Sequence, residues 1–164
     1  MMNLEIERKY LVKSDSFKDE AQKSYRITQG FLNKDPQRTV RVRVSNHSGK
    51  LTVKGKSSED GLSRFEWETL LSEEDAQELL LLCEPGLIEK TRYEIPYQGL
   101  LIEVDVFHEE NEGLILAEIE LPAMDTPLNT PAWIGTEVTG DPRYYNSYLS
   151  KTPYKVWPKK NGEI

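Results

Sequence analysis

Charged side chains recur at every second position in seven separate segments of this 164-residue chain. The pattern is plainest for Glu5 and Glu7 in one segment and for Arg41 and Arg43 in another. Because alternate residues of a β-strand point to the same face, each segment predicts a strand with one charged face and one apolar face. Carboxylates are the ligands that Mg²⁺ or Mn²⁺ prefers, and Arg and Lys bind phosphate oxygens. The pattern therefore indicates a site that holds a divalent cation together with a polyanion.

Acidic and basic residues occur in blocks, unlike the mixed polar face of an ordinary amphipathic strand. For any single strand, a sheet with one buried and one solvated face is the simplest alternative. A barrel whose lumen holds only structural ion pairs is another, although buried ion pairs stabilise proteins poorly. The charged face would carry eight acids (Glu5, Glu7, Glu66, Glu68, Glu103, Asp105, Glu118, Glu120) and eight bases (Lys9, Arg41, Arg43, Lys54, Lys56, Arg64, Lys90, Arg92).

Eight strands must position these residues. Turn residues such as Asn46-His47-Ser48-Gly49 and Glu59-Asp60-Gly61 separate several of them by short gaps, which favours an antiparallel meander. The fold class is predicted as mainly β (α+β): a closed eight-stranded antiparallel barrel with a charged lumen and an apolar outer face that helices cover. The predicted strands are Asn3–Val12, Ser24–Leu32, Arg38–Ser45, Lys50–Ser57, Leu62–Leu71, Ile88–Tyr97, Leu100–Phe107 and Leu114–Leu121.

Two helices are predicted outside the barrel. A capping box at Ser72–Asp75 starts the first, and Pro85-Gly86 stops it. Asp141-Pro142 introduces the second, from Arg143 to Lys151. A weaker helical turn is expected at Asp15–Ala21. We expect a single domain over residues 1–157 and a disordered tail over 158–164.

Composition excludes several classes of protein. The net charge of −7 argues against a nucleic-acid or anionic-membrane binder, and no apolar run is long enough to span a membrane. The single cysteine, Cys83, excludes an internal disulfide and suits the cytoplasm. His47 and His108 lack zinc-ligand spacing, and no P-loop or dinucleotide fingerprint is present. If the chain is an enzyme, a metal ion and carboxylates do the chemistry.

Seven segments in order resemble the motifs of the CYTH superfamily, the triphosphate tunnel metalloenzymes, and most of all its small bacterial members. The resemblance implies an eight-stranded tunnel with a C-terminal helix near one mouth. Members hydrolyse inorganic triphosphate, thiamine triphosphate or RNA 5′-triphosphates, or cyclise ATP. The matching segments are Glu5-Ile6-Glu7-Arg8-Lys9, Arg41-Val42-Arg43, Thr52-Val53-Lys54-Gly55-Lys56, Arg64-Phe65-Glu66-Trp67-Glu68, Lys90-Thr91-Arg92, Glu103-Val104-Asp105 and Glu118-Ile119-Glu120.

The same resemblance implies a role for each charged position. Glu66 and Glu68 would order the attacking water or a second metal ion, and Arg64 would orient them. The metal ion, Mg²⁺ or Mn²⁺, would be held by Glu5, Glu7 and Glu120, with Glu118 and Asp105 nearby. The phosphates would be bound by Lys9, Arg41, Arg43, Lys54, Lys90 and Arg92, with Lys56 as a further candidate.

The expected function is metal-dependent hydrolysis of inorganic triphosphate, because no segment resembles a base-recognition element. Cyclisation of ATP by a class IV-type adenylate cyclase and hydrolysis of a nucleoside or thiamine triphosphate are the enzymatic alternatives. A polyphosphate-binding module without turnover is the non-enzymatic one. The expected partner is a small-molecule triphosphate, with no nucleic acid and no membrane, and a homodimer is the assembly considered.

Overall fold

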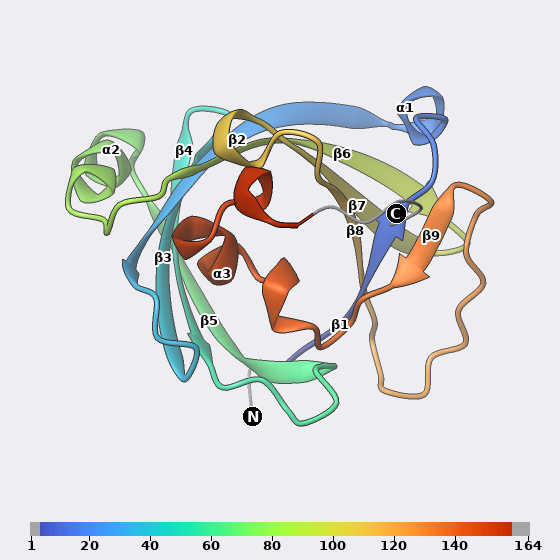
Figure 1. Cartoon of the computed structure of the whole chain (residues 1–164). Helices are drawn as coiled ribbons and strands as arrows, with labels where there is room; N and C mark the ends of the chain where they lie inside the picture. The colour runs from blue at the N-terminus through green and yellow to red at the C-terminus, as the bar shows by residue number, and fades with distance from the viewer. Residues whose placement is uncertain (1–3, 159–164) are drawn as a thin grey trace.

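The computed structural model describes residues 4–158, and its nine strands form one antiparallel sheet in the order β5-β4-β3-β2-β6-β7-β8-β1-β9. Leu4, Glu5 and Ile6 of the first strand also pair with the fifth, which closes the first eight strands into a barrel (Figure 1). The strands are β1 (Leu4–Val12), β2 (Lys23–Asn33), β3 (Arg38–Ser45), β4 (Ser48–Gly55), β5 (Ser63–Leu71), β6 (Ile88–Tyr97), β7 (Leu100–Phe107), β8 (Ile115–Glu120) and β9 (Ile134–Glu137).

The closed antiparallel barrel confirms the predicted fold class, with two differences in the strands larger than one residue at an end. The ninth strand was not predicted, because it has four residues and no clear alternation. It pairs with β1 through Tyr10 and Val12, beyond the point where β1 leaves β5. The fourth strand runs from Ser48 to Gly55 instead of Lys50 to Ser57, so Lys56 follows the end of the strand.

Three short α-helices and three 3-10 turns join or cover the strands: α1 (Phe17–Glu20), α2 (Glu73–Leu81), α3 (Asn146–Lys151), η1 (Glu109–Asn111), η2 (Pro142–Tyr144) and η3 (Tyr154–Val156). The Ser72 hydroxyl accepts a hydrogen bond from the Asp75 amide at 3.0 Å, which caps α2 as predicted. The helix predicted from Arg143 to Lys151 is divided, because Tyr145 has an extended backbone (ψ 138°). No helix within residues 4–158 is long and apolar enough to cross a membrane. Of the tail predicted to be disordered, residues 159–164 lie outside the described residues.

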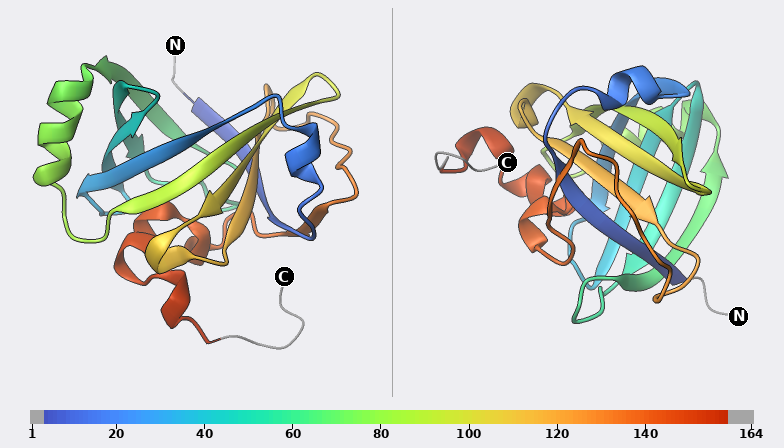
Figure 2. Two further views of the ribbon diagram at one scale, coloured as in Figure 1. Left: turned by 90° about the horizontal axis from the view of Figure 1, so that it is seen from above. Right: turned by 90° about the vertical axis from the view of Figure 1, so that its right-hand side faces the viewer.

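The apolar outer face of the barrel is covered in two places. On one side, Phe17 of α1 and Trp133 before β9 pack together with ring centroids 5.6 Å apart, over outward residues of β6, β7 and β8. On another side, Ala76 and Leu80 of α2 pack on Val42 of β3. Figure 2 shows α1 and α2 at separate places on the outside of the barrel. The outer face therefore holds much of the hydrophobic core, as expected for a barrel with a polar interior.

One end of the barrel interior is apolar. Ile88 and Phe107 share the inward face of their strands with charged residues, and they cluster with Leu116. Tyr144 and Leu149, from η2 and α3, belong to the same buried cluster. The C-terminal segment consequently lies across this end of the barrel (Figure 1), and its packing there closes the charged lumen on one side.

Candidate functional site

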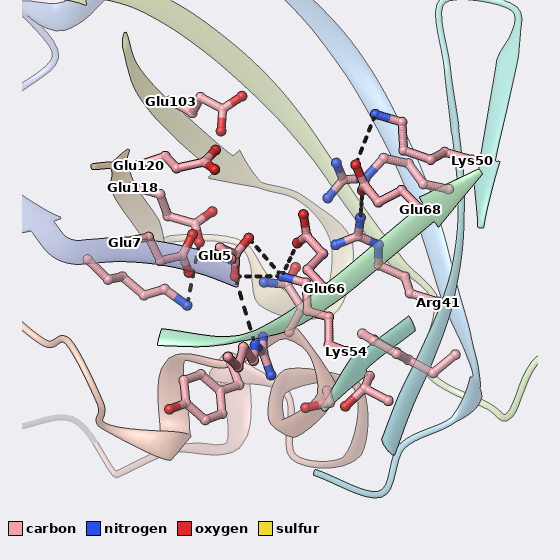
Figure 3. Close-up of a pocket in the computed structure, with 18 of the residues that line it drawn as sticks. Glu5, Glu7, Arg41, Lys50, Lys54, Glu66, Glu68, Glu103, Glu118 and Glu120 are labelled. Atoms are coloured by element: carbon pink, nitrogen blue, oxygen red, sulfur yellow. Dashed lines mark hydrogen bonds and ion pairs between the residues drawn. The ribbon is translucent and has the colours of Figure 1, made fainter. Parts of the chain in front are cut away.

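The barrel encloses a cavity of about 230 Å³, and Figure 3 shows the carboxylates and cations that face it. Side chains from all eight barrel strands line it, together with the first residues of α3 and the residue before them. The lining residues are Glu5, Glu7, Lys9, Phe31, Thr39, Arg41, Arg43, Lys50, Lys54, Arg64, Glu66, Glu68, Lys90, Arg92, Glu103, Glu118, Glu120, Tyr145, Asn146 and Ser147.

The two signs of charge occupy opposite halves of the cavity wall. The acidic pairs belong to β7, β8, β1 and β5, which are consecutive around the closed barrel. The basic pairs belong to β4, β3 and β6, and β2 stands between the last two. Lys9 and Arg64 are the cations on the acidic half. An anion inside the cavity thus has cations along one wall and carboxylates along the other.

Arg92 and Lys90, on the basic half of the cavity wall, share one buried carboxylate, that of Asp105. The Asp105 oxygens accept hydrogen bonds from Arg92 Nε at 2.8 Å and Nη2 at 2.9 Å, and Lys90 Nζ lies 2.7 Å from Oδ2. Burial alone would raise the pKa of Asp105, but Arg92 and Lys90 outweigh burial and lower it to about 2. Burial lowers the pKa of Lys90 to about 7 despite Asp105. Asp105 therefore fixes two cations whose remaining donors can face the cavity.

Arg41 and Arg43 are short of partners. Arg41 Nη2 donates to Thr52 Oγ1 at 2.9 Å and lies 3.6 Å from Glu68, yet its buried Nε has no hydrogen-bond partner among residues 4–158. Arg43 donates to Gln29, and the described residues give it no ion pair within 4 Å. Burial and neighbouring arginines lower the pKa of Arg43 to about 9. These cations leave hydrogen-bonding capacity for a bound anion.

The carboxylates on the opposite wall crowd one another. Lys54 Nζ lies 3.2 Å from both Glu5 and Glu66, which pairs one cation with two acids. Burial, followed by a hydrogen bond to Glu5, raises the pKa of Glu66 to about 7. Burial and the nearby Glu118 and Glu5 raise the pKa of Glu7 well above its usual range. The cations that contact these carboxylates do not fully offset the negative charge of this wall.

The carboxylates fit a hard divalent cation. The Glu5 and Glu66 carboxyls are close enough to share a proton, and so are those of Glu7 and Glu118; this proximity contributes to the shifted pKa of Glu66 and of Glu118. A metal ion could replace the shared proton. Within residues 4–158, no three His, Cys, Asp or Glu side chains form a ready-made coordination group. Mg²⁺ usually takes only one or two carboxylates and completes its sphere with water and substrate phosphate oxygens. The donor set suits a metal ion that binds together with its substrate.

The structure brings the predicted site residues to the cavity, with two exceptions. Lys56 is exposed beyond the end of β4 and does not line the cavity, because the chain leaves the sheet at Gly55. Asp105 lies behind Arg92 and Lys90 instead of in the lining. The other residues to which a catalytic, phosphate-binding or metal-binding role was assigned all line the cavity.

Several lining or supporting residues were not predicted. Lys50 and Thr52 share the face of Lys54, so strict alternation along β4 could have revealed them. Gln29 lies on β2, which carries no run of alternating charges and gave no signal. Tyr145 and Asn146 come from the C-terminal segment, which only the tertiary structure brings to the cavity.

Comparison with known proteins identifies the family to which this barrel belongs. The CYTH domain model matches residues 3–150. The chain belongs to the CYTH domain family. An inorganic triphosphatase of Acetivibrio thermocellus is 50% identical over 155 residues, which cover 94% of this chain and 97% of that protein. An inorganic triphosphatase of Nitrosomonas europaea is 36% identical over 152 residues, covering 89% and 96%.

A solved structure of this family shows the same architecture. The crystal structure of the inorganic triphosphatase NE1496 superposes with a TM-score of 0.64 at 32% identity, over 88% of this chain and 96% of that one. These CYTH relatives are hydrolases of phosphoanhydride bonds, and membership of the family implies a divalent metal requirement in general. The match confirms the family predicted from the charged motifs.

Proposed function

We propose that this CYTH protein hydrolyses inorganic triphosphate inside its barrel with the aid of Mg²⁺ or Mn²⁺. The observation that carries the proposal is the division of the cavity wall into a cationic half and an acidic half. Arg41 and Arg43 supply donors without full partners on one side, and Glu5 and Glu7 crowd together on the other. The named activity of two relatives that match nearly the whole chain supports the same substrate.

The size and lining of the cavity favour an inorganic substrate over a nucleotide. Its volume of about 230 Å³ lies below the roughly 300–1,000 Å³ of pockets for drug-sized ligands. Bases usually stack on free aromatic rings. Phe31 is only 2% exposed, and the Tyr145 ring is already contacted by the cations of Lys9 and Arg64. The cavity therefore offers little aromatic surface to a base.

Each group of residues has a defined task in the proposed reaction. Lys9, Arg41 and Arg43 bind the phosphate oxygens, with Lys54, Lys90 and Arg92, and stabilise the charge that spreads over them as the bond breaks. Asp105 keeps Arg92 and Lys90 in place. Glu66 and Glu68 orient the attacking water, and Arg64 orients them; Arg64 Nε also lies 3.8 Å from Glu5. The metal ion, held by Glu5, Glu7, Glu118 and Glu120, would neutralise charge on the phosphate oxygens when bound.

Phosphate release from tripolyphosphate tests this proposal directly. Turnover is expected with Mg²⁺ or Mn²⁺ and should be lost in Glu5→Ala and in Arg41→Ala. Turnover that persists in both variants contradicts a reaction inside the barrel. A panel that includes ATP, with detection of cyclic AMP, and thiamine triphosphate decides between the enzymatic alternatives. Tripolyphosphate binding without turnover would identify a binding module instead.

We further infer that residues 1–157 work as one catalytic unit in the cytoplasm, which the single free thiol of Cys83 supports. A homodimer is the proposed assembly. Its support is an exposed apolar strip on the outer face of β1 and β5, where Leu4, Phe65 and Trp67 are each more than two-fifths exposed. Light scattering on the purified protein measures its oligomeric state directly. A monomer at all concentrations excludes the homodimer.

A further inference from the structure

A chain of hydrogen bonds links two neutral amides to two cations at the floor of the cavity. Arg43 Nε donates to Gln29 Oε1 at 2.9 Å, and Gln29 Nε2 donates to Asn146 Oδ1 at 2.9 Å. The same Asn146 oxygen accepts a hydrogen bond from Lys90 Nζ at 3.1 Å. The order Arg43–Gln29–Asn146–Lys90 thus joins β3, β2, α3 and β6.

The orientation of both amides follows from the donors around them. Arg and Lys side chains are donors only. Gln29 must therefore present its oxygen to Arg43, and this leaves its NH₂ group facing Asn146. Asn146 then has to present its oxygen to both Gln29 and Lys90. Reversing either amide would place donors against donors, so the network has a single arrangement.

A carboxylate that orients a cation also offsets its positive charge, whereas a neutral amide oxygen orients the cation and leaves that charge for the substrate. Asp105 orients Arg92 but also offsets its positive charge. Gln29 orients Arg43 through one nitrogen without offsetting the charge, and the other guanidinium nitrogens stay available. Gln29 has no solvent exposure, so its bond to Arg43 is sheltered from water. The guanidinium is fixed, and no carboxylate pairs with it through this bond, which suits binding of a polyanion.

We infer that Gln29 and Asn146 are positioning residues, which hold Arg43 and Lys90 in the geometry that the phosphate chain requires. This inference rests on the proposed triphosphate hydrolysis. It also gives the C-terminal segment a task besides closing the barrel, since Asn146 is the first residue of α3. The helix is docked by buried Leu149 and by Ser150, whose hydroxyl donates to the Gly86 carbonyl at 2.6 Å. Docking of α3 consequently sets the position of a substrate-binding cation.

Kinetics of two variants and one control test this role. Gln29→Met and Asn146→Leu remove the amides at similar volume, and each should lower kcat/KM for tripolyphosphate by about 10- to 100-fold, because misplacing a binding group by about 1 Å can cost 100-fold. Asn111→Leu is the matched control. Asn111 is also a buried amide, and its Oδ1 accepts from the Tyr154 amide, away from the cavity. It should lower the melting temperature and leave kcat/KM within about 3-fold. Equal kinetic losses in all three variants would overturn the inference.

A double-mutant cycle separates positioning from a general loss of stability. Arg43→Lys keeps a cation but removes the Nε–H group that Gln29 accepts. If Gln29 acts through Arg43, then adding Gln29→Met to the Arg43→Lys variant should lower kcat/KM for tripolyphosphate only slightly further. If the two losses instead multiply, Gln29 does not act through Arg43.

Calorimetric titration with tripolyphosphate gives a readout that does not depend on turnover. Gln29→Met should weaken tripolyphosphate binding by about 10-fold, as expected when a charge-assisted contact is misplaced. If both the affinity and kcat/KM are unchanged in this variant, the inference is overturned. A wild-type protein that binds tripolyphosphate without hydrolysing it contradicts the proposed function but leaves this titration as a test of the positioning role.

Discussion

Replacing Arg92 by Met should destabilise the barrel more than replacing any exposed cation. Arg92 donates two hydrogen bonds to Asp105 through Nε and Nη2. Its Nη1 lies 3.3 Å from Glu103, and Nη2 also lies 3.5 Å from Glu118. Methionine keeps a long unbranched side chain but no charge. Asp105, which is 1% exposed, would keep Lys90 alone as its cationic partner. A buried carboxylate would then lack most of its compensation.

The expected cost follows from that geometry. Breaking a buried ion pair by removing one partner costs about 3–5 kcal/mol. For a domain of this length, each kcal/mol shifts the melting temperature by about 2–4 °C, so the Arg92→Met variant should melt roughly 6–20 °C below the wild type. The pKa of Asp105 is lowered to about 2 on folding. Its paired charge therefore stabilises the fold above about pH 4, and this contribution is lost as the pH falls towards 2.

Thermal unfolding by circular dichroism at pH 7 and at pH 3 measures both expectations. The gap between wild type and Arg92→Met should be large at pH 7 and smaller at pH 3. The double variant Arg92→Met with Asp105→Leu removes the stranded carboxylate, so it should recover part of the loss. A single variant that melts within about 3 °C of the wild type refutes the reasoning. A double variant whose loss in melting temperature equals the sum of the losses in the Arg92→Met and Asp105→Leu single variants also refutes it.

Three further predictions concern the acidic wall, the end of β4 and the metal ion. Glu7→Gln should raise the melting temperature of the metal-free protein at pH 8 and abolish hydrolysis. The reason is that a carboxyl whose pKa rises on folding destabilises the fold once the pH exceeds about 4.5. The gain in melting temperature should therefore be smaller at pH 5 than at pH 8. An unchanged melting temperature at pH 8 contradicts this prediction. Lys54→Ala should lower kcat for tripolyphosphate by about 100-fold or more, whereas Lys56→Ala should stay within about 2-fold; equal losses would show that Lys56 reaches the cavity. Dialysis against EDTA should stop phosphate release and Mg²⁺ or Mn²⁺ should restore it, so release that continues without added metal would exclude a metal ion on the acidic wall.

Local sequence patterns determined the strands and the type of chemistry. Alternation with a period of two is set by the geometry of each strand alone. Glu5 with Glu7, and Arg41 with Arg43, therefore already define a charged face, whichever strands lie beside them. The same local signals placed α2, where Ser72 caps the helix. The order of the charged motifs was also sufficient to identify the family.

The alternation also misplaced some residues at the ends of elements. Lys56 has the correct parity but follows the last paired residue of β4, because pairing with the neighbouring strand ends before it. The short strand β9 was missed because its pairing with β1 gives it stability that its own four residues do not show. Tyr145 interrupts a helix that Asp141-Pro142 predicts as continuous. In each case, contacts distant in sequence decide where an element ends.

Only the tertiary structure decided how the charged faces are arranged relative to one another. Along the chain, acidic β5 stands between basic β4 and basic β6, so the signs alternate. Pairing of Glu5 with Arg64, 59 residues later, closes the barrel and makes β7, β8, β1 and β5 one continuous acidic wall. Closure likewise brings Asn146 to Gln29 and Lys90. These contacts depend on pairing across the whole chain, which no local pattern encodes, and they turn a set of charged strands into a site for a metal ion and a phosphate chain.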